Sequence, residues 1–438
     1  MHSFHFQDGT LHCEEVDLEA LAAQHGTPLY VYSSATVRDH FRRLSGSLHG
    51  LDHLVCYAVK ANPNLAILNL LAREGAGFDI VSAGELFRVL KAGGQANQCT
   101  FAGVGKTKSE IAFALGKGVH SFNVESEAEL AAISEVARAH GSTAPFAVRV
   151  NPDVAAGGHK YISTGKSENK FGIGIERVFD VYESADKLGG LRAVGVQMHI
   201  GSQITEAGPF ALAVERMLPL AQKLKSAHAI EFLSIGGGIG IAYQSSLASG
   251  DNEWWQRREA GTPSLTLEGY AAAVAPLLRG IGLKVLLEPG RLVVGNAGVL
   301  LTRVLYRKAS PAKRFVIVDA GMNDLIRPAL YNGYHEIVPV RERAADAASE
   351  IADVVGPVCE SGDFFAQGRE LPVTEEGELI ALMSAGAYGF AMASNYNSRS
   401  LPAEILVDGS RAAVVRARQP MEDLIRGEAI PDWKPSKN

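Results

Sequence analysis

Several chemically useful side chains directly follow short apolar runs, and the first of them is Lys60. It directly follows the run 53–59. An ammonium group at the end of a buried strand is costly unless it is paired or deprotonated. Burial lowers the pKa of an amine, as a lysine that forms a Schiff base requires. The alternative for this segment alone is a surface lysine whose stem covers apolar neighbours.

Two later apolar runs end in a histidine and in a glycine cluster. His199 ends the run 194–199. Its ring suits stacking on an aromatic cofactor or proton exchange, and a hydrogen-bonded core histidine is the alternative. Ser202 is a candidate phosphate ligand, and the segment 236–240 reads GGGIG. Consecutive glycines allow backbone N–H groups to approach an anion closely, with a simple tight turn as the alternative.

A fourth run, 284–288, ends in Glu288, and Arg291 follows three residues later. A buried carboxylate needs a protonated partner, and a pyridinium nitrogen is one. The planar fork of Arg291 suits a carboxylate, so a plain Glu288–Arg291 ion pair is the alternative. A lysine, a stacking histidine, a glycine-rich phosphate cradle and an acid for a ring nitrogen are together the parts of a pyridoxal 5'-phosphate (PLP) site. The four runs therefore predict this cofactor.

These runs belong to a longer alternation of β-rich and helical segments between about residues 30 and 290. The expected strands are 53–59, 78–81, 99–102, 121–124, 146–150, 194–199, 232–235 and 284–288. The expected helices are 83–92, 108–117, 126–140, 175–188, 210–225 and 267–279, with 34–48 as a candidate eighth. The pattern predicts a parallel α/β barrel, whose active site lies at the carboxyl ends of its strands.

After residue 295 the pattern changes to short β-branched runs separated by Gly, Pro and Asp. These runs are 299–306, 315–319, 337–340, 352–355, 378–384 and 404–407. They predict a C-terminal, mostly antiparallel β domain of sandwich or barrel type, which the strand-like piece 29–32 is expected to join. We therefore expect a PLP-binding barrel over 30–295 and a β domain over 1–29 and 296–438. The polar, Gly-flanked stretch 157–170 is long for a barrel loop and is either disordered or a lid.

The composition argues against several classes of protein. The net charge of −6 lacks the basic excess of a nucleic-acid-binding surface. No apolar run approaches the roughly 20 residues of a membrane span, and the first residues do not form a signal peptide. The four cysteines are scattered without a CxxC pair, so neither a disulfide framework nor a zinc site is indicated. We expect a cytoplasmic enzyme without a metal.

In their order along the chain, these motifs resemble the barrel-type, alanine-racemase-like family of PLP-dependent decarboxylases. The matching segments are YAVKAN (57–62), HIGSQ (199–203), GGGIG (236–240), EPGR (288–291), IRPALY (326–331), CESGD (359–363) and GAYG (386–389). The resemblance spans about residues 28–407. Within the family, HKYISTG (159–165) followed by KFG (170–172) resembles diaminopimelate decarboxylases.

The resemblance implies a role for each matching residue. Lys60 would form the Schiff base with PLP, His199 would stack on its ring, and Glu288 would hold the ring nitrogen protonated. Cys359 would donate a proton. Contacts with the cofactor or the adjacent substrate group are implied for Ser202, Gly237, Gly238, Gly240, Gly290, Arg291 and Tyr388. Contacts with the distal end of the substrate are implied for Arg291, Arg327, Tyr331, Glu360 and Tyr388.

The implied reaction is decarboxylation of meso-2,6-diaminopimelate to L-lysine and CO₂, the last step of lysine biosynthesis. The family also implies a homodimer with shared sites, in which the loop 359–363 completes the partner's site. A substrate with two amino-acid ends needs arginines for its distal carboxylate and an acid, such as Glu360, for its distal ammonium.

Three alternatives stay open. One is a decarboxylase of another basic amino acid or carboxylated polyamine, such as D-lysine, D-ornithine or carboxynorspermidine. Another is a racemase of the same fold, which would carry a weak or cationic partner in place of Glu288. The third is a non-catalytic PLP-binding relative, which would lack Lys60, Cys359 or the arginines.

Overall fold

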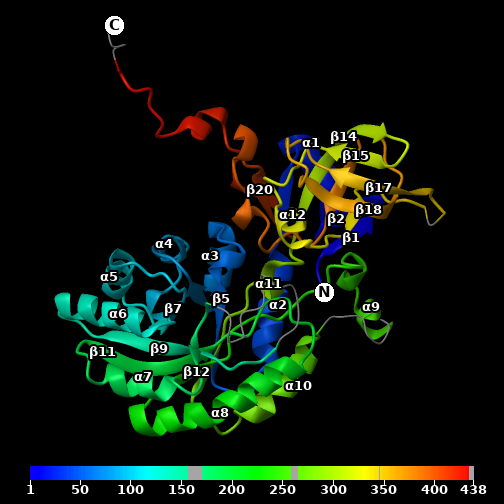
Figure 1. The fold of residues 1–438 in the computed structure, drawn as a ribbon. Coiled ribbons are helices and arrows are strands. Elements are labelled where there is room, and N and C mark those ends of the chain that lie inside the picture. The colour runs from blue at the N-terminus through cyan, green and yellow to red at the C-terminus, as the bar shows by residue number, and fades with distance from the viewer. Residues whose placement is uncertain (156–169, 258–264, 345, 434–438) are drawn as a thin grey trace.

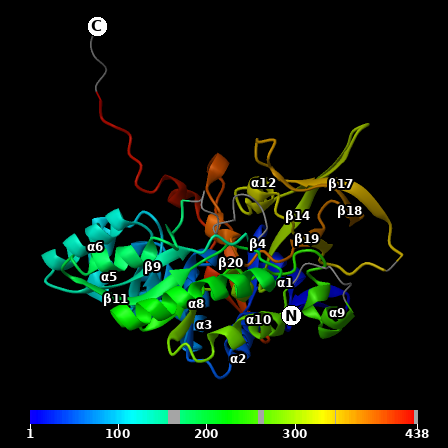
Figure 2. The same ribbon diagram turned by 60° about the horizontal axis from the view of Figure 1, so that its bottom comes forward.

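A computed structural model describes residues 1–155, 170–257, 265–344 and 346–433 of the chain. Two β systems dominate it, a closed barrel and an open sheet beyond one end of the barrel (Figure 1 and Figure 2). The expected fold, an α/β barrel with a mostly antiparallel β unit, is confirmed.

The barrel consists of eight parallel strands, and each of them coincides with an expected run. They are β5 (His53–Ala58), β6 (Gly77–Ile80), β7 (Cys99–Phe101), β8 (Ser121–Val124), β9 (Ala144–Asn151), β11 (Leu191–Met198), β12 (Phe232–Ser234) and β13 (Lys284–Leu287). Pairing of β8 with β9 and of β13 with β5 closes the ring. A short strand, β10 (Ile173–Gly174), is added beside β9. Because all eight strands run the same way, their carboxyl ends meet at one mouth.

The helices lie outside the strands (Figure 1). They are α3 (Leu65–Arg73), α4 (Ala83–Lys91), α5 (Lys108–Lys117), α6 (Glu127–Ala139), α7 (Val178–Ala185), α8 (Gly208–His228) and α10 (Leu267–Leu278). The candidate eighth helix, α2 (Ser34–Ser47), packs against α3 and α10 and so completes the layer. Local sequence fixes where several helices begin: Ser82 and Ser126 cap α4 and α6, and Thr107 with Glu110 forms a capping box on α5. Helix α3 was not among the expected helices.

The second sheet has the strand order β18-β17-β15-β14-β4-β20-β21, and β19 links β14 to β16. Its strands are β4 (Leu29–Ser33), β14 (Gly298–Ala309), β15 (Arg314–Val318), β16 (Ile337–Pro339), β17 (Ser349–Val355), β18 (Phe364–Pro372), β19 (Leu379–Leu382), β20 (Ala403–Asp408) and β21 (Arg411–Arg416). Most pairs are antiparallel, but β15–β17 and β4–β20 are parallel. Strands β18 and β21, which carry many polar residues, were missed.

The N-terminal segment forms a small sheet of β1 (Phe4–Gln7), β2 (Thr10–Cys13) and β3 (Val16–Asp17), followed by α1 (Leu18–His25). Apolar residues of β1, β2 and α1 share a core with β4, β14 and β20. By its pairing β4 belongs to the second sheet and crosses the expected limit at residue 30. The limits 30–295 and 1–29 with 296–438 stay a prediction. No helix in the described part of the chain is long and apolar enough to cross a membrane.

Candidate active site

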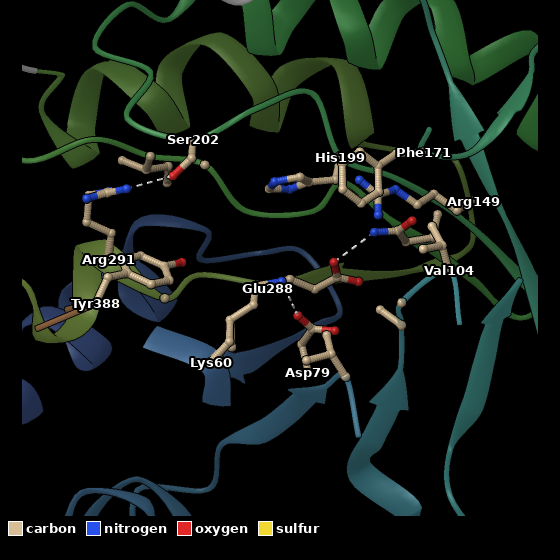
Figure 3. A pocket seen from close by; sticks show the side chains of 18 of the residues that line it. Lys60, Asp79, Val104, Arg149, Phe171, His199, Ser202, Glu288, Arg291 and Tyr388 are labelled. Atoms are coloured by element: carbon tan, nitrogen blue, oxygen red, sulfur yellow. Dashed lines mark hydrogen bonds and ion pairs between the residues drawn. The ribbon is translucent and has the colours of Figure 1, made fainter. Parts of the chain in front are cut away.

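A cavity of about 400 Å³ opens at the carboxyl ends of the barrel strands. Its walls contain most of the residues that the sequence singles out: Lys60, His199, Ser202, Gly238, Glu288, Gly290, Arg291, Arg327, Tyr331 and Tyr388. In Figure 3, Arg291, Ser202 and Tyr388 lie at one end of the cavity and Arg149 and Phe171 at the other, with Lys60 and Glu288 between them. Side chains far apart in sequence thus surround one space large enough for a small-molecule ligand.

Lys60 lies in the 3-10 turn Val59–Ala61 that directly follows β5. Its Nζ is 3.3 Å from Oδ2 of Asp79, a carboxylate buried just inside the end of β6. Burial lowers the pKa of Lys60, but the negative charges that face it, Asp79 foremost, outweigh burial and raise the pKa above its usual value. The expected lowering of the Lys60 pKa is therefore wrong, because the sequence did not reveal the charged neighbour.

Glu288 directly follows β13 and points into the barrel mouth (Figure 3). It does not pair with Arg291. Its carboxylate accepts hydrogen bonds from Ser234 Oγ at 2.7 Å, from Gln197 Nε2 at 2.8 Å and from Asn123 Nδ2 at 3.5 Å. Burial, and then repulsion by Asp79, raises the pKa of Glu288 to about 7 despite these bonds. A cationic N–H donor placed beside it would favour its ionised form.

This raised pKa predicts a pH-dependent stability of the cofactor-free protein. The pKa in the unfolded chain is about 4.3, so the folded state binds the proton more tightly, and stability is lost as the pH rises from about 4.3 to about 7. Over that window the unfolding free energy of the wild type should fall by about 3 kcal/mol relative to Glu288→Gln, which does not titrate. Denaturant titrations at several pH values measure this difference, and parallel curves for the two proteins would contradict it.

His199 lies between the strand ends and the glycine cluster. The backbone N–H of Gly237 donates to its Nδ1 at 3.2 Å, so Nδ1 accepts and the proton of the neutral ring is on Nε2. Burial, together with the positive charges of Arg149 and Lys60, lowers the pKa of His199 well below its usual value. The ring is thus a neutral, oriented aromatic group in the wall of the cavity.

The glycine cluster is required by close backbone contacts. A Cβ on Gly237 would lie 2.0 Å from the carbonyl oxygen of Glu288, and one on Gly238 would lie 2.3 Å from that of Gly201. Gly238 also has φ +101°, which disfavours other residues. Gly238 lines the cavity, whereas Gly237 and Gly240 lie behind it, with their N–H groups bonded to His199 and to the Ile204 carbonyl. Phosphate contacts for Gly237 and Gly240 stay predictions.

The distal end of the cavity holds two buried guanidinium groups, each about 6–7% exposed. Arg291 donates to Tyr243 Oη at 2.6 Å and to Ser202 Oγ at 3.0 Å, and it lies 4.9 Å from the ring centre of Tyr388. Arg327 is the first residue of α12 (Arg327–Tyr331) and lies 4.5 Å from the ring centre of Tyr243. Among the described residues, no carboxylate lies within salt-bridge distance of either guanidinium.

Some predicted residues lie away from this cavity. Cys359 and Glu360 belong to the exposed turn between β17 and β18 and are not among the described residues that line it. Cys359 is exposed, so it is not a buried thiol of the core. Of the stretch 157–170, predicted to be disordered or a lid, residues 157–169 lie outside the described residues, and with them the motif 159–165.

The structure also reveals cavity residues that the sequence analysis missed. Besides Asp79 and Gln197, these include Arg149 at the end of β9, whose guanidinium lies 4.8 Å from the ring centre of Phe171. Asp79 and Arg149 lie inside two expected strands, 78–81 and 146–150. A charged residue within an otherwise apolar strand was the signal that could have identified them. Tyr243 is not part of the described cavity lining but contacts both Arg291 and Arg327. It was missed because it follows GGGIG in a segment without regular structure.

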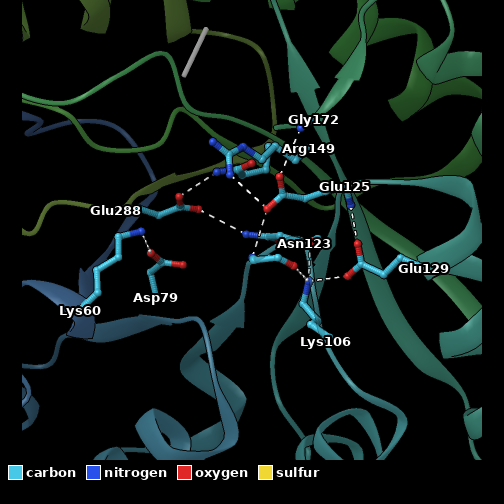
Figure 4. Close-up of polar contacts among 11 residues, drawn as sticks. Lys60, Asp79, Lys106, Asn123, Glu125, Glu129, Arg149, Gly172 and Glu288 are labelled. Atoms are coloured by element: carbon cyan, nitrogen blue, oxygen red, sulfur yellow. Dashed lines mark hydrogen bonds and ion pairs between the residues drawn. The ribbon is translucent and has the colours of Figure 1, made fainter. Parts of the chain in front are cut away.

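A buried charge network holds Arg149 in place (Figure 4). Glu125 directly follows β8 and accepts from Arg149 Nη1 and from the Gly103 N–H, each at 3.1 Å, and from the Gly172 N–H at 3.2 Å. The backbone N–H of Glu125 donates to Glu129 at 2.8 Å, and Glu129 pairs with Lys106 at 2.5 Å. One carboxylate thus joins three segments of the cavity wall.

Comparisons with known proteins identify the family. The family model described as "Pyridoxal-dependent decarboxylase, pyridoxal binding domain" matches residues 34–295. The diaminopimelate decarboxylase of Pseudomonas fluorescens is 49% identical to this chain over 98% of the chain and 99% of the relative. The chain belongs to the diaminopimelate decarboxylase family. The relative from Aquifex aeolicus is 43% identical over 96% of both proteins.

Solved structures of the family share the fold. The Helicobacter pylori diaminopimelate decarboxylase complexed with L-lysine has a TM-score of 0.85 and 40% identity, covering 94% of this chain and 98% of that one. The M. jannaschii diaminopimelate decarboxylase in co-complex with L-lysine has a TM-score of 0.89 and 34% identity, covering 98% of each chain. The resemblance expected from the motifs is confirmed, and with it the PLP cofactor.

The residues around the cavity fit PLP on structural grounds. Among the described residues, buried polar atoms that lack a hydrogen-bond partner include Arg291 Nε, Gln197 Oε1 and Asp79 Oδ1, and all three residues line the cavity. A bound anion near Arg291 and a protonated nitrogen near Glu288 would satisfy the charges at these two positions. Lys60 supplies the primary amine that the cofactor's aldehyde requires.

Proposed function

We propose that this protein decarboxylates meso-2,6-diaminopimelate to L-lysine and CO₂, the last step of lysine biosynthesis. The observation that carries the substrate assignment is the pair Arg291 and Arg327, two buried guanidinium groups without a carboxylate partner in the described chain. Such charges are costly to bury unless a ligand neutralises them. A PLP phosphate and a distal substrate carboxylate are two anionic groups that suit this pair.

The same observation separates diaminopimelate from simpler diamino acids. Ornithine and lysine present only an ammonium at the far end, which the unneutralised Arg327 guanidinium would repel. Diaminopimelate presents a carboxylate for Arg327 together with an ammonium. The racemase alternative is disfavoured because Glu288, an acid, occupies the position expected for the ring nitrogen's partner.

Bound PLP withdraws electrons from the substrate carbon that loses CO₂. Lys60 would hold the cofactor through its primary amine. The charge of Glu288 would hold a proton on the cofactor's ring nitrogen, and Ser234 and Gln197 fix the orientation of the Glu288 carboxylate by hydrogen bonds. His199 would pack its neutral ring against the cofactor, and Arg291 would bind an anionic group beside Ser202. Cys359 donates the proton that replaces CO₂.

We also propose that the protein acts as a homodimer in which each site receives Cys359 and Glu360 from the partner subunit. The support is their exposure on the turn 359–363 and their absence from the described lining of the cavity in one chain. A cytoplasmic location remains an expectation.

Turnover of four substrates by the purified, PLP-loaded protein tests the function: meso-diaminopimelate, ornithine, D-lysine and carboxynorspermidine. Equal amounts of lysine and CO₂ from diaminopimelate alone are expected. Turnover of another substrate instead would retain the decarboxylation at Lys60 but overturn the assignment of Arg327 to a distal carboxylate.

Mixing two inactive variants tests the shared site. Lys60→Ala and Cys359→Ala should each be inactive as pure homodimers. After they are unfolded and refolded together, mixed dimers should regain activity, because one of their two sites has both wild-type residues. A mixture of Lys60→Ala with the double variant Lys60→Ala/Cys359→Ala is the matched control. No gain in the first mixture, with mixed dimers present by mass, would contradict the shared site.

A further inference from the structure

His335 is a buried residue next to the predicted substrate end of the cavity, outside every motif of the sequence analysis. It lies just before β16, and Met383 lies just after β19. These strands pair antiparallel, with Ile337 opposite Leu382, so their ends bring His335 and Met383 together. The His335 side chain is fully buried and has no contact with solvent.

The partners of His335 fix its tautomer. Nδ1 lies 2.8 Å from the carbonyl oxygen of Met383, which can only accept a hydrogen bond, so Nδ1 donates. Nε2 lies 2.6 Å from Nη1 of Arg327, which can only donate, so Nε2 accepts. The imidazole is therefore neutral. In agreement, burial and the charge of Arg327 lower the pKa of His335 well below its usual value.

Tyr243 completes the surroundings of Arg327. Its ring meets His335 edge to face, with centres 5.4 Å apart and planes at 80°. The same ring lies 4.5 Å from the Arg327 guanidinium carbon and 5.8 Å from that of Arg291, and its hydroxyl accepts from Arg291. The two arginines are thus arranged around one aromatic ring, and the groups that orient Arg327 carry no negative charge.

We propose that His335 is a positioning residue for substrate specificity: as a neutral acceptor it fixes the Arg327 guanidinium and leaves its full charge for a carboxylate at the far end of the substrate. A protein carboxylate in this place would orient Arg327 equally well but would neutralise it and compete with the ligand. The inference rests on the proposed function, because it deepens the role given there to Arg327.

Two conservative variants separate the two hydrogen bonds of His335. In His335→Gln, the amide oxygen reaches the place of Nε2 and can accept from Arg327. In His335→Asn, the shorter amide can donate to the Met383 carbonyl as Nδ1 does, but it leaves Arg327 without its acceptor. The asparagine variant should raise the KM for diaminopimelate roughly tenfold, the size expected for one hydrogen bond to a charged group, with kcat and PLP absorbance retained. The glutamine variant should stay within about twofold of the wild-type KM.

The controls distinguish a positioning role from general destabilisation. His12→Asn changes another buried histidine, in β2, and should leave the KM unchanged. In an Arg327→Gln background, which itself raises the KM, His335→Asn should add nothing further. Equal impairment by asparagine and glutamine, or additive effects with Arg327→Gln, would overturn the inference. If the wild-type protein fails to convert diaminopimelate, the proposed function itself fails, which is a separate result.

Discussion

Replacing Lys60 by alanine should abolish turnover, lowering kcat by a factor on the order of 10³ or more, and should remove the visible absorbance of bound PLP. Lys60 is the lysine in the cavity wall, and its Nζ is 3.3 Å from Asp79. No other described residue that lines the cavity offers a primary amine to hold the cofactor. Stopped assays with diaminopimelate and absorbance spectra of the purified variant measure the two effects.

Lys108→Ala is a matched control for this variant. Lys108 is an exposed lysine, at 59% of its side chain, that pairs with Glu135 at the surface. Its removal should change neither activity nor absorbance, because exposed ion pairs contribute little. Wild-type-like turnover by Lys60→Ala would contradict the proposed chemistry. A normal absorbance spectrum without turnover would show that Lys60 is needed for the reaction but not for binding the cofactor.

Replacing Glu125 by alanine should lower the unfolding free energy by about 3–5 kcal/mol, the range for a buried ion pair that loses one partner. The Glu125 and Arg149 side chains are 1% and 9% exposed. The substitution leaves a buried guanidinium and the N–H groups of Gly103 and Gly172 without their acceptor (Figure 4). Denaturant unfolding of the cofactor-free protein measures the loss.

The controls for Glu125 use one neighbour and one double variant. Glu127→Ala removes a carboxylate two residues away that pairs with Arg177 at the surface, and it should cost no more than about 1 kcal/mol. Adding Arg149→Met to Glu125→Ala should recover part of the lost stability, because the unpaired charge is removed. A loss below about 1 kcal/mol in Glu125→Ala would show that this network contributes little to stability.

The sequence indicated those parts of the site that depend on local pattern. Eight β-rich runs alternating with helical segments predicted the barrel, and the convergence of parallel strand ends then predicted that Lys60, His199 and Glu288 lie together. Their positions follow from one rule, because each residue directly follows or ends a strand whose apolar pattern is visible in the chain. Strand β18, with charges at Arg369 and Glu370, lacked such a pattern and was missed.

Tertiary structure alone decided the electrostatics and the specificity elements. The pKa of Lys60 is raised rather than lowered because the parallel pairing of β5 with β6 brings Asp79 to the ammonium. His335 and Arg327 are close in sequence, but the tautomer that makes His335 a neutral acceptor depends on Met383, 48 residues away. The sequence by itself determined which groups are available at the strand ends. Only the fold decided which charges face one another, because Coulomb and hydrogen-bond energies depend on distances between groups, and the packing of the folded chain sets these distances.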